Sequence, residues 1–256
     1  MNAADLQRIH SHLRVAAPRW RDHIRVGPFL ATFSRDTDNP YLNYAIPDDE
    51  ARPSRADVDA LVAAYRERDR LPRLEYLPSI APGVEPALVA GGFTVETRTP
   101  LMVYTGGGDA LPVPGVELLA PASDDDFLGA ATAQWEAYEE AGAVAPRAVE
   151  SLRRTVAAGG MVVLARDVAT REPAGAGACT APGAAASELT SVGVRERFRR
   201  RGIAQAMTYW LARQMSARDG IACVFLMADS EREERIYARA GFETISEVLH
   251  ISLKNA

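Results

Sequence analysis

The sequence predicts an α/β protein with a mixed central sheet flanked by helices, and two domains of this kind in tandem. Three observations predict this fold class. Short apolar segments typical of strands alternate with longer segments of helical periodicity. The length, 256 residues, exceeds that of an average domain. A helix end, a Gly-Phe pair and a long strand follow one another twice, at 88–95 and 237–244. The repeat indicates a duplicated fold, although Gly-Phe after a helix is also common C-cap chemistry.

The first domain is predicted at 1–108, followed by a linker at 109–115 in which glycine and proline break both helices and strands. Ser54 is the expected N-cap of a helix whose apolar residues recur at helical spacing. Helices are expected at 3–17, at 54–65 and shortly after Pro82, and strands at 23–33, 41–46, 73–77 and 94–104.

The second domain is predicted at 116–256. A proline opens its second helix and two glycines end it, as is common at helix boundaries. Helices are expected at 124–140, 146–158, 202–217 and 230–240, and strands at 161–166, 174–180, 188–194, 221–228 and 244–253.

Composition excludes several classes of protein. The chain is 47% hydrophobic and 25% charged, as is ordinary for a globular protein, and its net charge of −5 does not favour nucleic acid or anionic membranes. Residues 1–14 lack the pattern of a signal peptide and no apolar run approaches about 18 residues, so a cytoplasmic protein is expected. Cys179 and Cys223 lie in apolar segments typical of buried thiols. The four scattered histidines predict no metal site.

The segment 188–205 carries the clearest functional signal, because a strand runs into a glycine-containing loop that opens a helix. Backbone N–H groups at such a helix start form an anion site that suits a diphosphate. Arg199, Gly202 and Ala204 match the signature R/Q-x-x-G-x-G/A, in which small residues let the backbone approach phosphates closely. This segment resembles the GNAT superfamily of N-acetyltransferases.

The resemblance covers about 116 to the chain end. Glu196 stands where a proline is usual in the family, and Ser230 stands where many members have asparagine. Tyr237, four residues before a Gly-Phe pair, lies where the family has its catalytic acid. The resemblance implies acetyl-CoA as cofactor, in a GNAT domain preceded by a degenerate GNAT-like domain without a cofactor motif. The residues expected to bind it are Val192, Gly193, Val194, Arg199, Arg200, Arg201, Gly202, Ile203, Ala204, Gln205 and Ser230.

Five arginines at 195, 197, 199, 200 and 201 have an alternative interpretation as a solvated loop or a nucleic-acid patch. The acidic chain and the adjoining helix start favour phosphates of the cofactor, and not every arginine needs to touch them. Gly193 inside an apolar strand predicts a bulge or a close ligand approach.

Acetyl transfer to an amine needs a proton acceptor, because an amine with a pKa of roughly 10 is mostly protonated at neutral pH. Glu188, at the start of the strand 188–194, is the leading candidate for this base, directly or through water; the alternative is a surface glutamate. Tyr237 is expected to protonate the departing thiolate, with packing on its helix as the alternative. The backbone N–H of Val194 is expected to bind the carbonyl oxygen.

The acceptor is expected to contact Trp135, Tyr138 and Glu139, although these aromatic residues also suit a core and the glutamate a solvated surface. A small-molecule amine and a peptide amine both remain open, as do a monomer and a homodimer. No nucleic-acid or membrane partner is expected. The alternative function is a catalytically inactive acyl-CoA-binding regulatory module.

The first domain is predicted to bind no cofactor. Residues 47–54, where a diphosphate loop would follow the strand 41–46, contain three acidic residues and no glycine. Leu88 occupies the position that corresponds to Tyr237 in the repeat. One acetyl-CoA per chain is therefore expected, with the first domain walling the acceptor cleft.

Overall fold

The structure is a computed structural model that describes residues 3–108, 112–140 and 142–254. It divides into two compact units, one formed by Met1–Leu101 with Ile245–Ala256 and the other by Met102–Thr244. The last strand therefore groups with the first unit, whereas the sequence placed it in the second domain. The expected linker at 109–115 lies partly outside the described residues, since 109–111 are not described.

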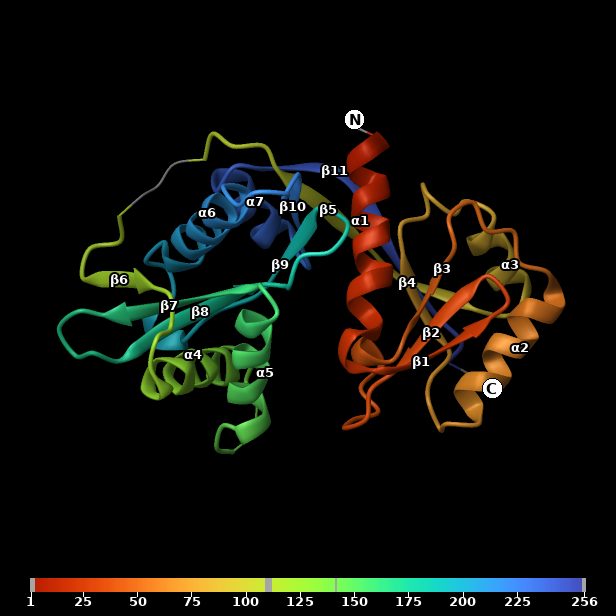
Figure 1. The fold of residues 1–256 in the computed structure, drawn as a ribbon, viewed down its shortest axis with the longest axis horizontal. Helices are drawn as coiled ribbons and strands as arrows, with labels where there is room; N and C mark the ends of the chain where they lie inside the picture. The colour runs from red at the N-terminus through yellow and green to blue at the C-terminus, as the bar shows by residue number, and fades with distance from the viewer. Residues whose placement is uncertain (1–2, 109–111, 141, 255–256) are drawn as a thin grey trace. The chain divides into compact units, whose positions relative to one another are not determined.

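The first unit contains three α-helices and a set of strands, with α1 on one side of the strands and α2 and α3 on the other (Figure 1). The strands pair in the order β1-β2-β3-β4-β11, with β3 and β4 parallel and the other pairs antiparallel. Its elements are α1 (Ala3–Ala16), a 3₁₀ helix (Ala17–Trp20), β1 (Asp22–Val26), β2 (Phe29–Phe33), β3 (Ala45–Pro47), α2 (Arg55–Arg66), β4 (Arg73–Tyr76), α3 (Val84–Ala90) and most of β5 (Thr94–Tyr104) and of β11 (Phe242–Ser252).

Two strand predictions in this unit were wrong. The single strand expected at 23–33 is a hairpin of β1 and β2, because Gly27 takes a positive φ of 52° and turns the chain. The strand expected at 41–46 begins instead with a 3₁₀ helix at Pro40–Leu42, whose start is capped by the side chain of Asn39 accepting from the Tyr41 N–H.

The second unit has four α-helices and a sheet in which β6, β7, β8 and β9 are antiparallel and β9 and β10 are parallel. Strand β6 was not predicted; the other elements lie within a few residues of their predicted bounds. The elements are β6 (Val116–Leu119), α4 (Asp124–Ala137), α5 (Pro146–Ala157), β7 (Met161–Asp167), β8 (Pro173–Cys179), β9 (Ala186–Val194), α6 (Ile203–Ser216), β10 (Cys223–Met227) and α7 (Glu231–Arg239).

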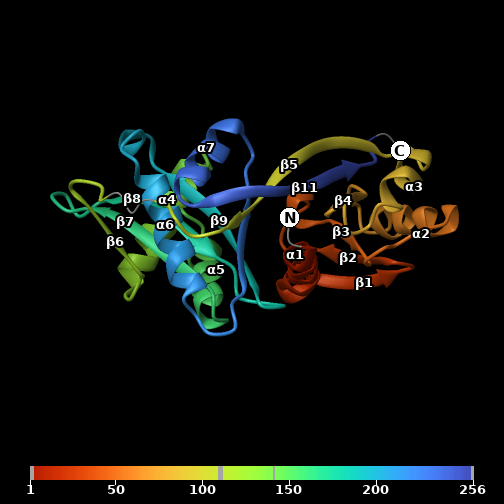
Figure 2. The same cartoon turned by 90° about the horizontal axis from the view of Figure 1, so that it is seen from above.

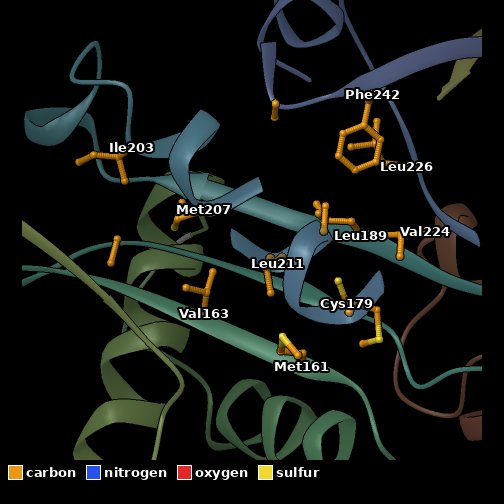
Figure 3. Close-up of a cluster of buried hydrophobic side chains, with 14 of the residues drawn as sticks. Met161, Val163, Cys179, Leu189, Ile203, Met207, Leu211, Val224, Leu226 and Phe242 are labelled. Carbon is orange, nitrogen blue, oxygen red and sulfur yellow. The ribbon is translucent and has the colours of Figure 1, made fainter. Parts of the chain in front are cut away.

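The two faces of this sheet carry separate apolar cores. Along β7, Met161 and Val163 belong to the core beneath α6, whereas Val162 and Leu164 belong to the core beneath α4 and α5. This alternation follows from side chains pointing to opposite faces along a strand. Figure 3 shows the first of these cores, with Leu211 of α6 over the strand residues. Because β9 and α6 share the first of these cores, the packing sets the positions of the end of β9 and the start of α6.

We expect Leu211→Ala to destabilise the protein by about 2–5 kcal/mol, because it leaves a cavity at a fully buried site in this core. Urea unfolding followed by circular dichroism measures the change. Leu128→Ala is the matched control, since Leu128 is 49% exposed on α4 and its loss should cost less than about 1 kcal/mol. Equal effects of the two substitutions would contradict the assigned core.

The repeated Gly-Phe segment has the same local structure in both copies. Helix α3 is followed by Gly92, with a φ of 92°, and then by β5; helix α7 is followed by Gly241, with a φ of 93°, and then by β11. A left-handed glycine of this kind ends a helix without steric cost. Strands β5 and β11 are neighbours in the strand order and run side by side (Figure 2).

Among the described residues, no helix is long and apolar enough to cross a membrane. No group of three or more histidine, cysteine, aspartate or glutamate side chains in that part of the chain is placed to hold a metal ion. Both cysteines are buried and neither is part of a disulfide, as predicted from their apolar surroundings.

Candidate active site

The second unit contains a cleft of about 590 Å³, a size typical of small-molecule sites. Four elements line it: the end of β9, the start of α6, one face of α7 and the last residues of α4. The lining residues predicted from the sequence are Tyr138, Val192, Gly193, Val194, Arg199, Arg200, Gly202, Ile203, Ala204, Gln205, Ser230 and Tyr237.

The cleft opens where β9 and β10 separate. Their parallel pairing covers only Ala186–Glu188 and Cys223–Phe225, and no residue of β10 is paired with β9 beyond Glu188 in the described part of the chain. On its other side β9 stays paired with β8 up to Val194. The edge of β9 that faces away from β8 is thus left without a strand partner beyond Glu188 in the described part of the chain. The Ser191 and Val194 carbonyls accept hydrogen bonds from the side chains of Gln134 and Arg199, and the remaining main-chain groups of this edge are available to an extended ligand.

The start of α6 differs from those of α2, α4 and α7 and resembles those of α3 and α5 in having no side-chain cap. Ser54, Ser123 and Ser230 cap α2, α4 and α7 through their hydroxyl groups, whereas α6 begins at Gly202 with no side-chain cap. The N–H groups of its first turn therefore face the cleft uncapped. Gly202 has a φ of 82°, and a Cβ built there would meet no atom within 4 Å. This geometry leaves a cradle for an anion at a positive helix end.

The five arginines of the loop before α6 divide into two groups. Arg195 pairs with Glu136 at 2.6 Å, Arg197 pairs with Glu172 at 2.8 Å, and Arg201 donates to the Pro114 carbonyl at 3.3 Å. None of these three arginines is among the residues that line the cleft. The predicted role of Arg201 in cofactor binding is therefore not supported by its position.

The other two arginines, Arg199 and Arg200, line the cleft. The Arg199 side chain donates from Nε to the Val194 carbonyl at 3.1 Å and from Nη2 to the Ala137 carbonyl at 3.2 Å. Arg199 thus ties the loop to β9 and to the end of α4, while Arg200, with a φ of 65°, forms the turn before Gly202.

Tyr237 and Tyr138 approach the cleft from α7 and from the end of α4. Burial raises the pKa of Tyr237 above its ordinary value, and the negative charge of Glu233 raises it further. The pKa of Tyr138 is raised by the same two causes, although its side chain is partly exposed. Both phenols therefore keep their protons at neutral pH and are possible proton donors.

Besides Arg201, three predicted site residues lie outside the cleft lining. Glu188 lies on β9 opposite Phe225 of β10, at the closed end of the strand pair, and its N–H donates to the Thr180 hydroxyl at 2.9 Å. The Trp135 Nε1 donates to the Gly142 carbonyl at 3.1 Å, which closes the loop after α4. Glu139 is exposed.

Gly193 lies beside the bulge that was expected and also allows α4 to pack closely on β9. A Cβ at this position would lie 2.7 Å from Cβ of Ala137, so glycine is required for the end of α4 to pack on β9. The expected bulge is present nearby, because the register of β8 and β9 shifts between Ala176 and Ala178. The bulge places Ser191 in a left-handed conformation with a φ of 57°.

Five lining residues of α7 were not predicted from the sequence: Arg232, Glu233, Arg235, Ile236 and Arg239. Helical spacing indicates one of them, because Glu233 lies one turn before Tyr237 on the same face of the helix. The lining in total has five arginines and a single carboxylate among the described residues. A cleft with this excess of positive charge, in a chain of net charge −5, favours a polyanionic ligand.

Comparison with known proteins agrees with this geometry. A family model described as FR47-like protein matches residues 149–251, which include β9, α6 and α7. This match agrees with the resemblance of the same part of the chain to the GNAT acetyltransferase superfamily. No curated protein matches the chain.

Solved structures extend the GNAT likeness to the whole chain. A GCN5-related N-acetyltransferase from Kribbella flavida is 24% identical, with a TM-score of 0.79 over 100% of this chain and 98% of that one. One from Sphaerobacter thermophilus is 17% identical, with a TM-score of 0.61 over 99% and 93%. A tandem GNAT protein from the clavulanic acid biosynthesis pathway is 15% identical, with a TM-score of 0.59 over 89% and 79%. The duplicated GNAT fold expected from the sequence is confirmed.

Proposed function

We propose that this GNAT protein is an N-acetyltransferase that transfers the acetyl group of acetyl-CoA directly to a primary amine, without a covalent enzyme intermediate. The observation that carries the proposal is the uncapped start of α6 beside the open edge of β9, within a cleft rimmed by arginines. Bound acetyl-CoA supplies an activated acyl group as a thioester, together with about four negative charges on its phosphates.

The residues present fit this cofactor. The empty space above Gly202 accepts a phosphate close to the first-turn N–H groups of α6. Arg200 lies beside that space, and Arg235 and Arg239 contribute positive charge from α7. The free edge of β9 at Val192–Val194 offers main-chain hydrogen bonds to the amide groups of the pantetheine arm.

Tyr237 is the proposed general acid. Its phenol lies on the cleft wall and stays protonated at neutral pH, so it is able to donate a proton to the departing sulfur. Cys179 is buried and the pKa of its thiol is raised to about 12 by burial, so it is unsuited to act as a nucleophile at neutral pH. This supports direct transfer.

Tyr138, on the cleft wall opposite α7, is the residue we propose to contact the acceptor amine, which is a small molecule or a peptide. The position of Glu188 outside the cleft favours a second candidate function, an acyl-CoA-binding module without catalysis. An assay of free thiol released from acetyl-CoA, against a panel of primary amines, separates the two. Amine-dependent release is expected, whereas binding without release would favour the second candidate.

We expect one acetyl-CoA to bind per chain, at the uncapped start of α6 beside the open edge of β9. In the first unit the N-terminus of α2 is closed by a reciprocal capping box of Ser54 and Asp57. Isothermal titration calorimetry measures the stoichiometry, and two equivalents of acetyl-CoA per chain would contradict this assignment.

A further inference from the structure

We infer that Glu233 of α7, and not Glu188 of β9, accepts the proton of the acceptor amine. This inference rests on the proposed acetyl transfer. The two residues differ in where they lie: Glu233 is on the cleft wall, one helical turn before Tyr237, whereas Glu188 is absent from the cleft lining. Glu233 is also the sole carboxylate among the described residues that line the cleft.

The position of the Glu233 carboxylate is fixed by its own loop. Its Oε2 accepts a hydrogen bond from the Asp229 N–H at 2.9 Å, and its backbone N–H donates to the Ser230 hydroxyl at 3.3 Å. These two bonds hold the first turn of α7 and leave Oε1 available to a ligand. A base held in this way needs little reorganisation when the acceptor binds.

Glu233 also shares its surroundings with the proposed acid. All three residues line the cleft, and the negative charge of Glu233 raises the pKa of both the Tyr237 and the Tyr138 phenol. The acid and the base lie on one helix, four residues apart.

The charged neighbours of Glu233 suit a proton acceptor. Burial raises the pKa of the Glu233 carboxyl, and the charge of Asp229 raises it further, whereas Arg232 and the hydrogen bond from the Asp229 N–H lower it. Arg199 and Arg200 face the same cleft from the loop before α6. A carboxyl with a raised pKa is a stronger base, and the carboxylate form is regained as the pH rises through that pKa.

The proton balance is complete with these two residues and water. The ammonium nitrogen loses one proton to the Glu233 carboxylate, and the neutral amine then bonds to the acyl carbon and releases a second proton to water. The bond from that carbon to sulfur breaks, and sulfur keeps the electron pair and takes one proton from the Tyr237 phenol. Exchange with water then returns Glu233 to its charged form and Tyr237 to its protonated form.

The substitution Glu233→Gln tests the inference, because the amide oxygen still accepts from the Asp229 N–H but no longer takes up a proton. With a primary alkylamine that the wild-type protein acetylates, we expect kcat/KM to fall about a hundredfold at pH 7. The deficit should shrink as the pH approaches the pKa of the amine. With hydroxylamine, which is neutral at pH 7, the two proteins should differ little.

Glu234→Gln is the matched control. Glu234 is the next residue of α7, its carboxylate accepts from the Thr244 hydroxyl at 2.7 Å, and it does not line the cleft. The substitution Glu234→Gln should leave kcat/KM for both amines, and its pH profile, unchanged. A readout independent of turnover is infrared difference titration, in which the spectrum of wild type minus Glu233→Gln should contain a carboxyl that titrates above the ordinary glutamate range.

Several results would overturn this role. They are an unchanged pH profile in Glu233→Gln, an equal loss with hydroxylamine, or a Glu233 carboxyl that titrates in the ordinary range. A change in KM alone would show that Glu233 binds the amine without taking its proton, which also contradicts the inference. If the wild-type protein acetylates no amine, the proposed function itself fails. If wild type is active and Glu233→Gln is equally active, only the role of Glu233 fails.

Discussion

The Gly202→Val protein is expected to bind acetyl-CoA at least about a hundredfold more weakly than the wild type. A valine side chain would fill the space above the first turn of α6, where Gly202 now meets no atom within 4 Å. We expect the variant to lose two charge-assisted hydrogen bonds that backbone N–H groups donate to phosphate. At about 1.5–3 kcal/mol each, their loss suffices for a hundredfold fall in affinity. Isothermal titration calorimetry measures the affinity.

Gly220→Val is the control for backbone strain. Gly220 has a φ of 80° and open space around its Cβ position, as Gly202 does, but it lies in the turn between α6 and β10 and does not line the cleft. Both substitutions carry a similar left-handed penalty of roughly 1–2 kcal/mol. Normal affinity in a folded Gly202→Val protein, or equal losses in both variants, would argue against a phosphate site at α6.

The Tyr237→Phe protein is expected to lose about 100- to 1,000-fold in kcat, with little change in its affinity for acetyl-CoA. The substitution removes the hydroxyl proton and keeps the ring, which packs against the core beneath α6. Because the pKa of Tyr237 is raised, the wild-type protein should keep this proton at mildly alkaline pH, and its rate should not fall there through loss of the acid.

Tyr104→Phe provides the comparison for Tyr237→Phe, since Tyr104 packs against Phe242 and is not part of the cleft lining. We expect it to retain wild-type turnover. Steady-state thiol release and calorimetry on both variants separate catalysis from binding. Unchanged kcat in Tyr237→Phe would remove Tyr237 from the mechanism.

Hydrophobic periodicity, together with the glycine, proline and capping residues at the ends of elements, predicted most of the secondary structure. The strand β5 was predicted with its observed bounds, and the helix at 54–65 was found because Ser54 has the chemistry of an N-cap. Errors arose where one residue overrides the pattern. Gly27 divides an alternating segment into a hairpin, and Pro40 starts a 3₁₀ helix where a strand was expected.

The grouping of β11 with the first unit was not visible in the sequence either. Local pattern shows that 244–253 is a strand but not which neighbours it finds, and β11 pairs with β4, more than 160 residues earlier in the chain. Strand pairing at such a distance is set by tertiary packing.

Residues of the candidate site could be predicted where their role follows from the spacing of a local motif. They could not be predicted where their role depends on the direction in which the side chain points. Gly202 and Tyr237 were found from motif spacing alone, and both line the cleft. Glu188 was chosen from its place on a strand, but the pairing of Glu188 with Phe225 puts it at the closed end of β9 and β10. The carboxylate on the cleft wall, Glu233, lies in a helix so rich in charge that no single residue stood out in the sequence.

The most direct test of acetyl transfer to nitrogen is mass spectrometry of the reaction with acetyl-CoA labelled with ¹³C in the acetyl group. The wild-type protein, incubated with the amine panel, should yield one labelled N-acetyl product for each free thiol formed, and Gly202→Val should yield neither. Thiol release balanced by labelled acetate instead of an acetylated amine, or labelled acetyl groups on oxygen, would contradict the assignment of this protein as an N-acetyltransferase.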